Sequence, residues 1–220
     1  MREGIREMLR KAGATVIGFA SVADGLSEDI RHLSFAISIG VNGNLRESNL
    51  DHLKKLQKKT ALFLRGKGYR FFCIPPDSDR INDSFASKLY PLFTHKIAAT
   101  CAGIGWIGRN GLLISPTYGP RLSLATVLTD ARFKTDLPIE NCLCGDCMLC
   151  VDHCPSKAIT GETWSRNAPY PDMIKADKCR SHKEKSRPVN GKPNCGLCIN
   201  ICPYGRGYIE IKSEVMEETQ

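Results

Sequence analysis

The spacing of apolar residues near the start of the chain predicts one helix followed by two strands. Ile5, Met8 and Leu9 recur at the helical period among charged residues, which predicts a helix over residues 1–12. The apolar run of residues 15–20 is short enough to be a strand. Residues 33–41 are rich in β-branched side chains and form the clearest strand of the sequence.

A long amphipathic helix and further strands are predicted next. The predicted elements are a helix from Ser48 to Gly66, a strand at 69–74, a helix from about residue 84 to Gly103, and strands at 112–115 and 122–128. The expected buried stripe of the long helix is Leu50, Leu53, Leu56, Thr60 and Phe63 or Leu64. Ser27 is a possible cap for a short helical turn before the second strand. This order of elements predicts an α+β or mixed α/β fold for residues 1–135.

Closely spaced cysteines replace the hydrophobic periodicity from Cys144 onward. Two runs occur, Cys144-x2-Cys147-x2-Cys150-x3-Cys154-Pro155 and, after Cys179, Cys195-x2-Cys198-x3-Cys202-Pro203. Two-residue spacers let three thiolates curl around one face of an iron–sulfur cube. The cysteine before proline points away and ligates the other cluster, as in two-cluster ferredoxins.

The two runs therefore predict two [4Fe–4S] clusters. The first is predicted to be held by Cys144, Cys147, Cys150 and Cys202, and the second by Cys154, Cys179, Cys195 and Cys198. Tetrahedral zinc is the alternative for Cys-x2-Cys pairs, but two interlocked runs that each close with Cys-Pro favour iron–sulfur. Ligation by thiolates alone leaves no need for an open iron site, which favours electron transfer over substrate chemistry at iron.

Composition predicts a reducing compartment and a basic surface. The chain has 220 residues, 42% of them hydrophobic, and no apolar run approaches the ~20 residues of a membrane span. No secretory or twin-arginine signal is present, so the eleven cysteines indicate metal ligation in the cytoplasm and not disulfides. The net charge of +8 is concentrated in residues 54–59 and 175–187. Both runs are expected to be solvated faces, although the second also suits an acidic partner, a phosphate or RNA.

The glycine segment Gly103-x-Gly105-x-x-Gly108 matches the dinucleotide-binding fingerprint in its letters alone. That fingerprint needs a strand before the glycines and a helix after them, whereas a helix is predicted before and a strand after. The glycines are expected instead to let the backbone approach something flat or bulky, beside an exposed Trp106.

Other side chains that could carry chemistry have structural interpretations. His95 lies among apolar helical positions and is expected to be a hydrogen-bonded core or boundary histidine and not a metal ligand. Cys73 and Cys101 are expected to pack as small side chains. Cys142 is interpreted as a peripheral free thiol, with substitution as a cluster ligand as the alternative.

The run from Ala102 to Asn110, the following Leu112-Leu113-Ile114 and the cysteine run from Cys144 resemble epoxyqueuosine reductases, which are relatives of reductive dehalogenases. The resemblance covers nearly the whole chain. It implies a nitroreductase-like α/β corrinoid-binding domain, residues 1–135, followed by a ferredoxin-like double [4Fe–4S] module, residues 136–220. It also implies cobalamin in the base-off form, and the chain lacks the Asp-x-His-x-x-Gly motif of mutase-type proteins. The residues that the resemblance assigns to the corrinoid pocket are Gly103, Gly105, Trp106, Ile107, Gly108, Arg109, Asn110 and Ser181.

The implied reaction passes electrons through both clusters to cobalt, which reduces a substrate while a protein acid supplies a proton. Ferredoxin or flavodoxin is the expected electron donor. The catalytic residue stays unknown, because residues 88–91 match the region of the family's catalytic Asp but hold no carboxylate, and Asp83 is only the nearest one upstream. The family's C-terminal helical repeats, which help to grip tRNA, are also missing after Cys202.

The leading hypothesis is therefore a cobalamin-dependent oxidoreductase of this type. Its substrate is expected to be a small molecule, or a corrinoid on a partner protein, and less so tRNA. One alternative is a ferredoxin-like electron carrier whose N-terminal domain is empty or binds flavin. Epoxyqueuosine reduction in tRNA is a second alternative, and a basic RNA-binding module with structural clusters is a third.

Overall fold

The structure, a computed structural model, describes residues 1–23, 26, 28–43, 47–76, 93–186 and 195–205. The chain forms two compact units. The N-terminal unit comprises residues 1–105 and 122–139, and the cysteine-rich unit comprises residues 106–121 and 140–220. The domain boundary expected between residues 135 and 136 stays a prediction. Residues 106–121 precede that boundary and yet group with the cysteine-rich unit.

An antiparallel four-stranded sheet forms the centre of the N-terminal unit, in the order β1-β2-β6-β3. Its strands are β1 Val16–Ser21, β2 Phe35–Asn42, β3 Phe71–Ile74 and β6 Leu122–Thr129. In the register, Ile37 lies opposite Phe19 on one side and Val127 on the other. A 3-10 turn, η2 Glu28–Ile30, precedes β2, while its expected cap Ser27 lies outside the described residues. Every strand matches a predicted apolar run, which confirms the α+β prediction for this unit.

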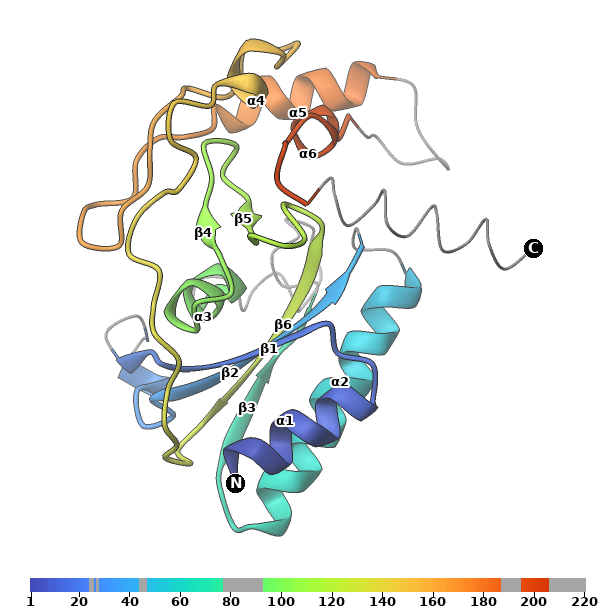
Figure 1. The fold of residues 1–220 in the computed structure, drawn as a ribbon, viewed down its shortest axis with the longest axis vertical. Helices are drawn as coiled ribbons and strands as arrows, with labels where there is room; N and C mark the ends of the chain where they lie inside the picture. Colours follow the sequence, from blue (N-terminus) through green and yellow to red (C-terminus); the bar gives the residue numbers. More distant parts are fainter. Residues whose placement is uncertain (24–25, 27, 44–46, 77–92, 187–194, 206–220) are drawn as a thin grey trace. The chain divides into compact units, whose positions relative to one another are not determined.

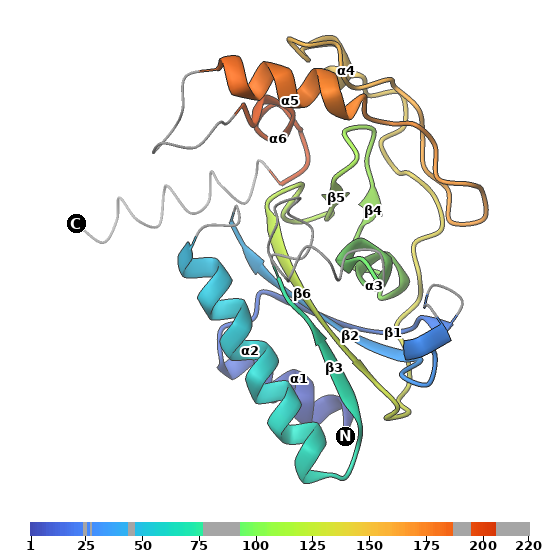
Figure 2. The same cartoon turned by 180° about the vertical axis from the view of Figure 1, so that it is seen from behind.

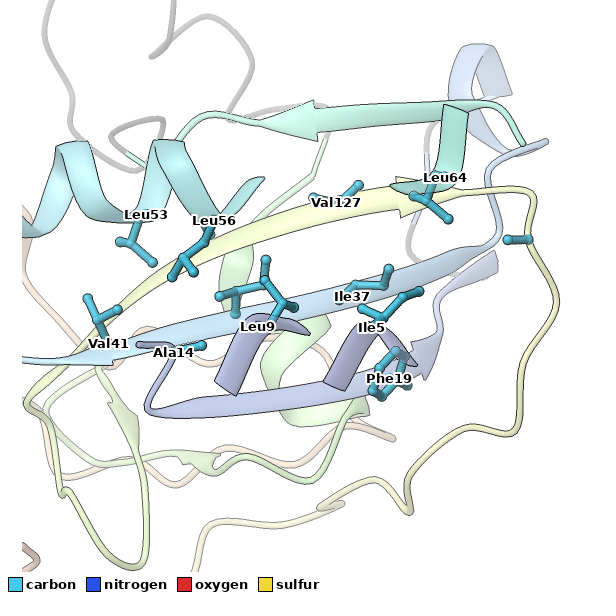
Figure 3. Close-up of a cluster of buried hydrophobic side chains, with 13 residues drawn as sticks. Ile5, Leu9, Ala14, Phe19, Ile37, Val41, Leu53, Leu56, Leu64 and Val127 are labelled. Carbon is cyan, nitrogen blue, oxygen red and sulfur yellow. The ribbon is translucent and has the colours of Figure 1, made fainter. Parts of the chain in front are cut away.

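Two helices, α1 Arg2–Lys11 and α2 Glu47–Gly66, cover one face of this sheet (Figure 1). Their apolar stripes pack against the odd-numbered positions of β1, β2 and β6. Figure 3 shows the labelled side chains of helices and strands gathered into one cluster. The predicted stripe of α2 is confirmed by the buried residues Leu50, Leu53, Leu56, Thr60 and Leu64.

The opposite face of the sheet carries α3 His95–Cys101 (Figure 2). Small residues let this helix come close. A Cβ on Gly18 would lie 2.6 Å from the Cβ of Ala102, the residue after α3, and Gly18 pairs with Ser38 on the same face. A larger side chain at position 18 would therefore push the helix away. The expected beginning of this helix, residues 84–92, lies outside the described residues, as do Asp83 and residues 88–91.

Buried polar side chains connect α2 and α3 to the sheet. The Gln57 Nε2 donates to the carbonyl oxygens of Ile74, at 2.6 Å, and Thr126, at 2.9 Å. His95 has its Nε2 2.9 Å from the carbonyl of Pro75 and its Nδ1 2.9 Å from the Thr126 hydroxyl. A carbonyl only accepts, so Nε2 carries the proton and Thr126 donates to Nδ1. His95 is thus the buried, hydrogen-bonded histidine that was predicted.

Short helices and loops make up the cysteine-rich unit. Its elements are β4 Trp106–Ile107, β5 Leu113–Ile114, α4 Leu149–Asp152, α5 Ala176–Lys185 and α6 Leu197–Asn200. β4 and β5 form an antiparallel hairpin, and α4 contacts α6. β4 was not predicted, because two residues show no period. None of the helices described in either unit is long and apolar enough to cross a membrane.

Candidate metal centre

Four cysteines from the two runs surround one cavity. Cys144, Cys147, Cys150 and Cys202 line it, and these are the four residues predicted for the first cluster. The Cys147 N–H donates to the Cys144 carbonyl at 3.1 Å, so the first Cys-x2-Cys spacer closes into a turn. Cys150 lies in α4. The other residues lining the cavity are Arg109, Asn110, Ile114, Leu149, Pro203 and Tyr204.

The remaining four cysteines are also neighbours in space. Burial raises the pKa of Cys198, and the nearby thiolates of Cys179, Cys195 and Cys154 raise it further. Cys198 lies in α6 and Cys179 in α5, so separate elements bring this second set together. The structure thus groups the cysteines as the sequence predicted, although the assignment of each one as a ligand stays a prediction.

Burial and the crowding of like charges oppose ionisation of Cys150 and Cys202. Burial is the largest cause that raises the pKa of Cys150 and of Cys202, and the Cys144 and Cys147 thiolates raise both further. Metal ligation needs thiolates. Bound iron would supply positive charge that offsets the repulsion among four thiolates.

Cys144 differs from Cys150 and Cys202 because hydrogen bonds favour its thiolate. A bond from the Cys142 thiol lowers the pKa of Cys144 most; burial opposes it, and the Trp106 N–H lowers the pKa further. The same bond is the largest cause that raises the pKa of Cys142. Cys142 therefore lies beside the first set of cysteines as a thiol donor.

The segment 106–121, which carries the β4–β5 hairpin, reaches both groups of cysteines. The Trp106 Nε1–H donates to the sulfur of Cys144 at 3.4 Å. The Asn110 side-chain amide donates to the carbonyl of Cys198 at 3.2 Å. Because Cys144 and Cys198 belong to different predicted sets, this one segment holds the two sites together.

Two arginines of the same segment bind backbone carbonyls of the cysteine loops. Arg109 donates to the carbonyl of Gly145 at 2.9 Å and also to that of Gly161. Arg121 donates to the carbonyl of Tyr204 at 3.1 Å and to that of Ile199 at 3.2 Å. Both guanidinium groups bind loops of the cysteine-rich unit.

The residues assigned by resemblance to a corrinoid pocket lie in several places. Gly103 and Gly105 belong to the N-terminal unit, residues 106–110 belong to the hairpin of the cysteine-rich unit, and Ser181 is exposed on α5. Trp106 was expected to be exposed and is only 1% exposed. That expectation was wrong because the ring packs edge-on against Tyr204, with centroids 4.8 Å apart.

Two of these glycines are required by packing within their own unit. Gly103 has φ +65°, and a Cβ there would lie 2.4 Å from the carbonyl oxygen of Leu137. A Cβ on Gly108 would lie 2.5 Å from the Ile114 side chain. The corrinoid-pocket assignment stays a prediction, and these contacts are a second reason for glycine at both positions.

Sequence reasoning missed Arg121 and Tyr204. The Tyr204 hydroxyl donates to the carbonyl of Leu143 at 2.8 Å, which ties the end of the second cysteine run to the beginning of the first. An aromatic residue directly after Cys202-Pro203 was the available signal. Nothing local marked Arg121, because its partners lie far along the chain.

The remaining predicted side chains behave as structural residues. Cys73 is half-buried and packs against the core of the N-terminal unit, as predicted, and Cys101 is half-buried at the end of α3. The lysines at 54, 55, 58 and 59 are exposed on α2, which confirms a solvated face. Among the described residues, no three His, Cys, Asp or Glu side chains lie close enough to hold a single metal ion.

Comparison with known proteins identifies the cysteine-rich unit. Residues 143–205 match the family described as a 4Fe-4S double cluster binding domain. This match confirms the prediction of two [4Fe–4S] clusters over the zinc alternative.

The similarity extends beyond that domain. The epoxyqueuosine reductase of Lactococcus garvieae is 32% identical over 119 residues, which cover 50% of this chain and 31% of that protein. An epoxyqueuosine reductase solved with a modified tRNA stem loop shares the fold, with a TM-score of 0.66, 20% identity, and coverage of 94% of this chain and 65% of that one. A catabolic reductive dehalogenase gives a TM-score of 0.66 at 18% identity over 93% of this chain and 32% of the other.

These matches cover part of each relative, and they include both units of this chain. The structural match covers 94% of this chain, and the double-cluster family matches residues 143–205 of the cysteine-rich unit. The chain therefore resembles epoxyqueuosine reductases, and it spans about a third of the length of the curated relative it matches.

Proposed function

We propose that this chain uses two [4Fe–4S] clusters to deliver electrons to a base-off cobalamin for the reduction of a substrate. The observation that carries the proposal is the extent of the structural similarity. It covers 93–94% of the chain in both reductases and dehalogenases, and so includes the α/β unit as well as the cluster domain. When bound, cobalamin supplies a strongly reducing cobalt centre.

The proposed ligands of the clusters are the two sets of cysteines that the structure brings together. The first is Cys144, Cys147, Cys150 and Cys202, and the second is Cys154, Cys179, Cys195 and Cys198. Cys198→Ala should lower the iron content from about eight to about four per chain. Cys73→Ala is the matched control, since Cys73 belongs to neither set. Full iron content in the Cys198 variant would contradict the assignment.

The electron donor is proposed to be an acidic protein such as a ferredoxin or flavodoxin. Helix α5 carries the proposed ligand Cys179 and exposes Lys178, Arg180, Lys183 and Lys185. A cationic surface attracts an acidic donor and speeds association at low salt. The position of a ligand on the same helix would place an arriving electron close to the second cluster.

The substrate is proposed to be a small molecule or a corrinoid on a partner protein. Epoxyqueuosine in tRNA is the second candidate, favoured by the shared fold with a reductase solved with a tRNA stem loop. Anaerobic incubation with tRNA that carries epoxyqueuosine, followed by nucleoside analysis, separates the two. Conversion that requires added cobalamin would establish the tRNA activity.

The cofactor content tests the proposal directly. Protein purified without oxygen from cells grown with cobalamin should contain about eight irons and about one cobalt per chain, with corrinoid bands in the visible spectrum. Eight irons without cobalt uptake would favour the electron carrier. Zinc in place of iron would refute the whole proposal.

A glycine substitution tests where the corrinoid binds. Gly105 is buried, and Gly105→Leu is expected to abolish cobalamin uptake while the iron content stays unchanged. Gly66→Leu is the matched control, because a Cβ at Gly66 would meet nothing within 4 Å. Normal cobalamin uptake by the Gly105 variant would remove this residue from the proposed pocket.

A further inference from the structure

The indole of Trp106 is held against the sulfur of a proposed cluster ligand. Its Nε1–H donates to Cys144 Sγ at 3.4 Å, and the residue is 1% exposed. Tyr204 packs against the ring at an interplanar angle of 81°. The Tyr204 hydroxyl is fixed in turn by the carbonyl of Leu143, the residue before Cys144. The donor is therefore buried, and the contacts of the ring fix its orientation.

A positive charge lies at the same site. Arg109 lines the cavity together with Cys144 and binds the carbonyls of Gly145 and Gly161. None of the ion pairs between described residues includes Arg109. Its charge is therefore available to act on the thiolates beside it.

We propose that Trp106 raises the redox potential of the cluster held by Cys144, and that the charge of Arg109 acts in the same direction. The inference rests on the proposed first ligand set. Reduction adds one electron, and so one negative charge, to a group that four thiolates already make anionic. A buried N–H donor on a ligand sulfur and a nearby cation stabilise the reduced form more than the oxidised form. Trp106 is thus a positioning residue that acts through Cys144.

The test compares Trp106→Phe with the unchanged protein, both loaded with iron and sulfide without oxygen and without corrinoid. Dithionite supplies the electrons in a redox titration, and electron paramagnetic resonance follows the reduced clusters. We expect two reduction steps in each protein, with one step at lower potential in the variant. At the potential that half reduces this cluster in the unchanged protein, we expect the ratio of reduced to oxidised cluster to be several-fold smaller in the variant.

Two control variants assign the shifted step. The Ser156 hydroxyl lies 3.6 Å from the sulfur of Cys154, a proposed ligand of the other cluster, so Ser156→Ala should move only the other step. Trp164 is the other tryptophan of the chain and is 8% exposed; no hydrogen bond from its indole to a cysteine occurs among the described residues. Trp164→Phe should move neither step.

A shape-matched analogue separates the N–H group from the ring. If Trp106→Phe binds fewer than about eight irons, benzothienylalanine at position 106, in the Trp164→Phe background, keeps the ring and replaces N–H by sulfur. Full iron with unchanged potentials in either variant overturns the proposal. Loss of iron in the analogue also overturns it, since the N–H would then be needed to hold the cluster. Failure of the unchanged protein to bind iron would refute the proposed function instead.

A pair of substitutions tests the charge of Arg109. Arg109→Lys keeps the positive charge, and Arg109→Gln removes it. The same reduction step should lie closer to that of the unchanged protein in the lysine variant than in the glutamine variant. Equal shifts would show that the charge has no part in setting the potential.

Discussion

Gln57 shows how a single polar residue decides the packing of α2 on the sheet. It interrupts the apolar stripe that the sequence predicted, and it is 5% exposed. Its amide donates to the carbonyls of Ile74 in β3 and Thr126 in β6, so one side chain binds two neighbouring strands. Buried polar groups are stable only when hydrogen-bonded, and both amide hydrogens have a partner here.

Replacement of Gln57 by Leu should destabilise the N-terminal unit by about 1–3 kcal/mol, because two buried carbonyls lose a donor. Urea unfolding, followed through the circular dichroism of the sheet and helices, measures the effect. Lys58→Leu is the matched control, as Lys58 is exposed on the same helix. Equal midpoints for the two variants would contradict this role of Gln57.

Cys73 offers a second prediction at this scale. Burial raises the pKa of Cys73 to about 11. The folded state therefore keeps the thiol protonated at pH 8. As the pH rises toward the folded pKa, the thiol ionises more readily in the unfolded chain, so the folded state loses stability relative to it. Iodoacetamide, which attacks the thiolate, should label the Cys73 peptide much more slowly in native protein than in guanidinium. Similar labelling rates, measured by mass spectrometry, would show that the thiol is not protected.

The segment 106–121 is the element on which the cluster site depends. Trp106 donates a hydrogen bond to the sulfur of Cys144, and Asn110 donates one to the Cys198 carbonyl. Two arginines of the segment bind backbone carbonyls of the cysteine-rich unit. The hairpin pairs Trp106 with Ile114, which fixes the directions of these side chains. Metal sites need such supporting residues as well as ligands.

Asn110→Ala should loosen the loop that carries Cys198 without removing any ligand. Asn110 binds the Cys198 carbonyl and the N–H of Leu112, and both bonds would be lost. We expect full iron loading without oxygen and a several-fold faster loss of iron in air, measured with an iron chelator. Asn167→Ala, at an exposed asparagine of the same unit, is the control. Equal rates of iron loss in the two variants would argue against this support.

The whole molecule combines two units stabilised in different ways. The N-terminal unit has a core of helices packed on a sheet. The cysteine-rich unit consists mainly of loops and short helices, and burial together with neighbouring thiolates opposes ionisation of its Cys150. Small metal domains commonly obtain their folding free energy from the bound metal.

Removal of iron should therefore unfold one unit and leave the other folded. After oxidation and chelation, amides of the cysteine-rich unit, such as those of α4 and α6, are expected to lose protection from hydrogen exchange. Amides of β2 and β6 should stay protected, since their partners lie in the N-terminal unit. Simultaneous loss of protection in both units would show that the iron also stabilises the sheet.

Comparison of sequence and structure shows which signals are local. The helical period of Leu53 and Leu56 correctly predicted a buried stripe, because a helix repeats its facing positions within a few residues. Trp106 was predicted to be exposed, because its partners Tyr204 and Cys144 are distant in the chain. Arg121 was missed for the same reason, because its carbonyl partners, Tyr204 and Ile199, are also distant in the chain.

The sequence by itself determined the four strands of the sheet, the helices α1 and α2 and the two cysteine runs, since periodicity and short spacers act over a few residues. Only the tertiary structure decided that residues 106–121 group with the cysteine-rich unit and that Arg109, Asn110 and Ile114 line the cysteine cavity. Trp106 and Cys144 are 38 residues apart, and Asn110 and Cys198 are 88 apart. Contacts over such separations depend on how the whole chain packs, and no local pattern of residues encodes them.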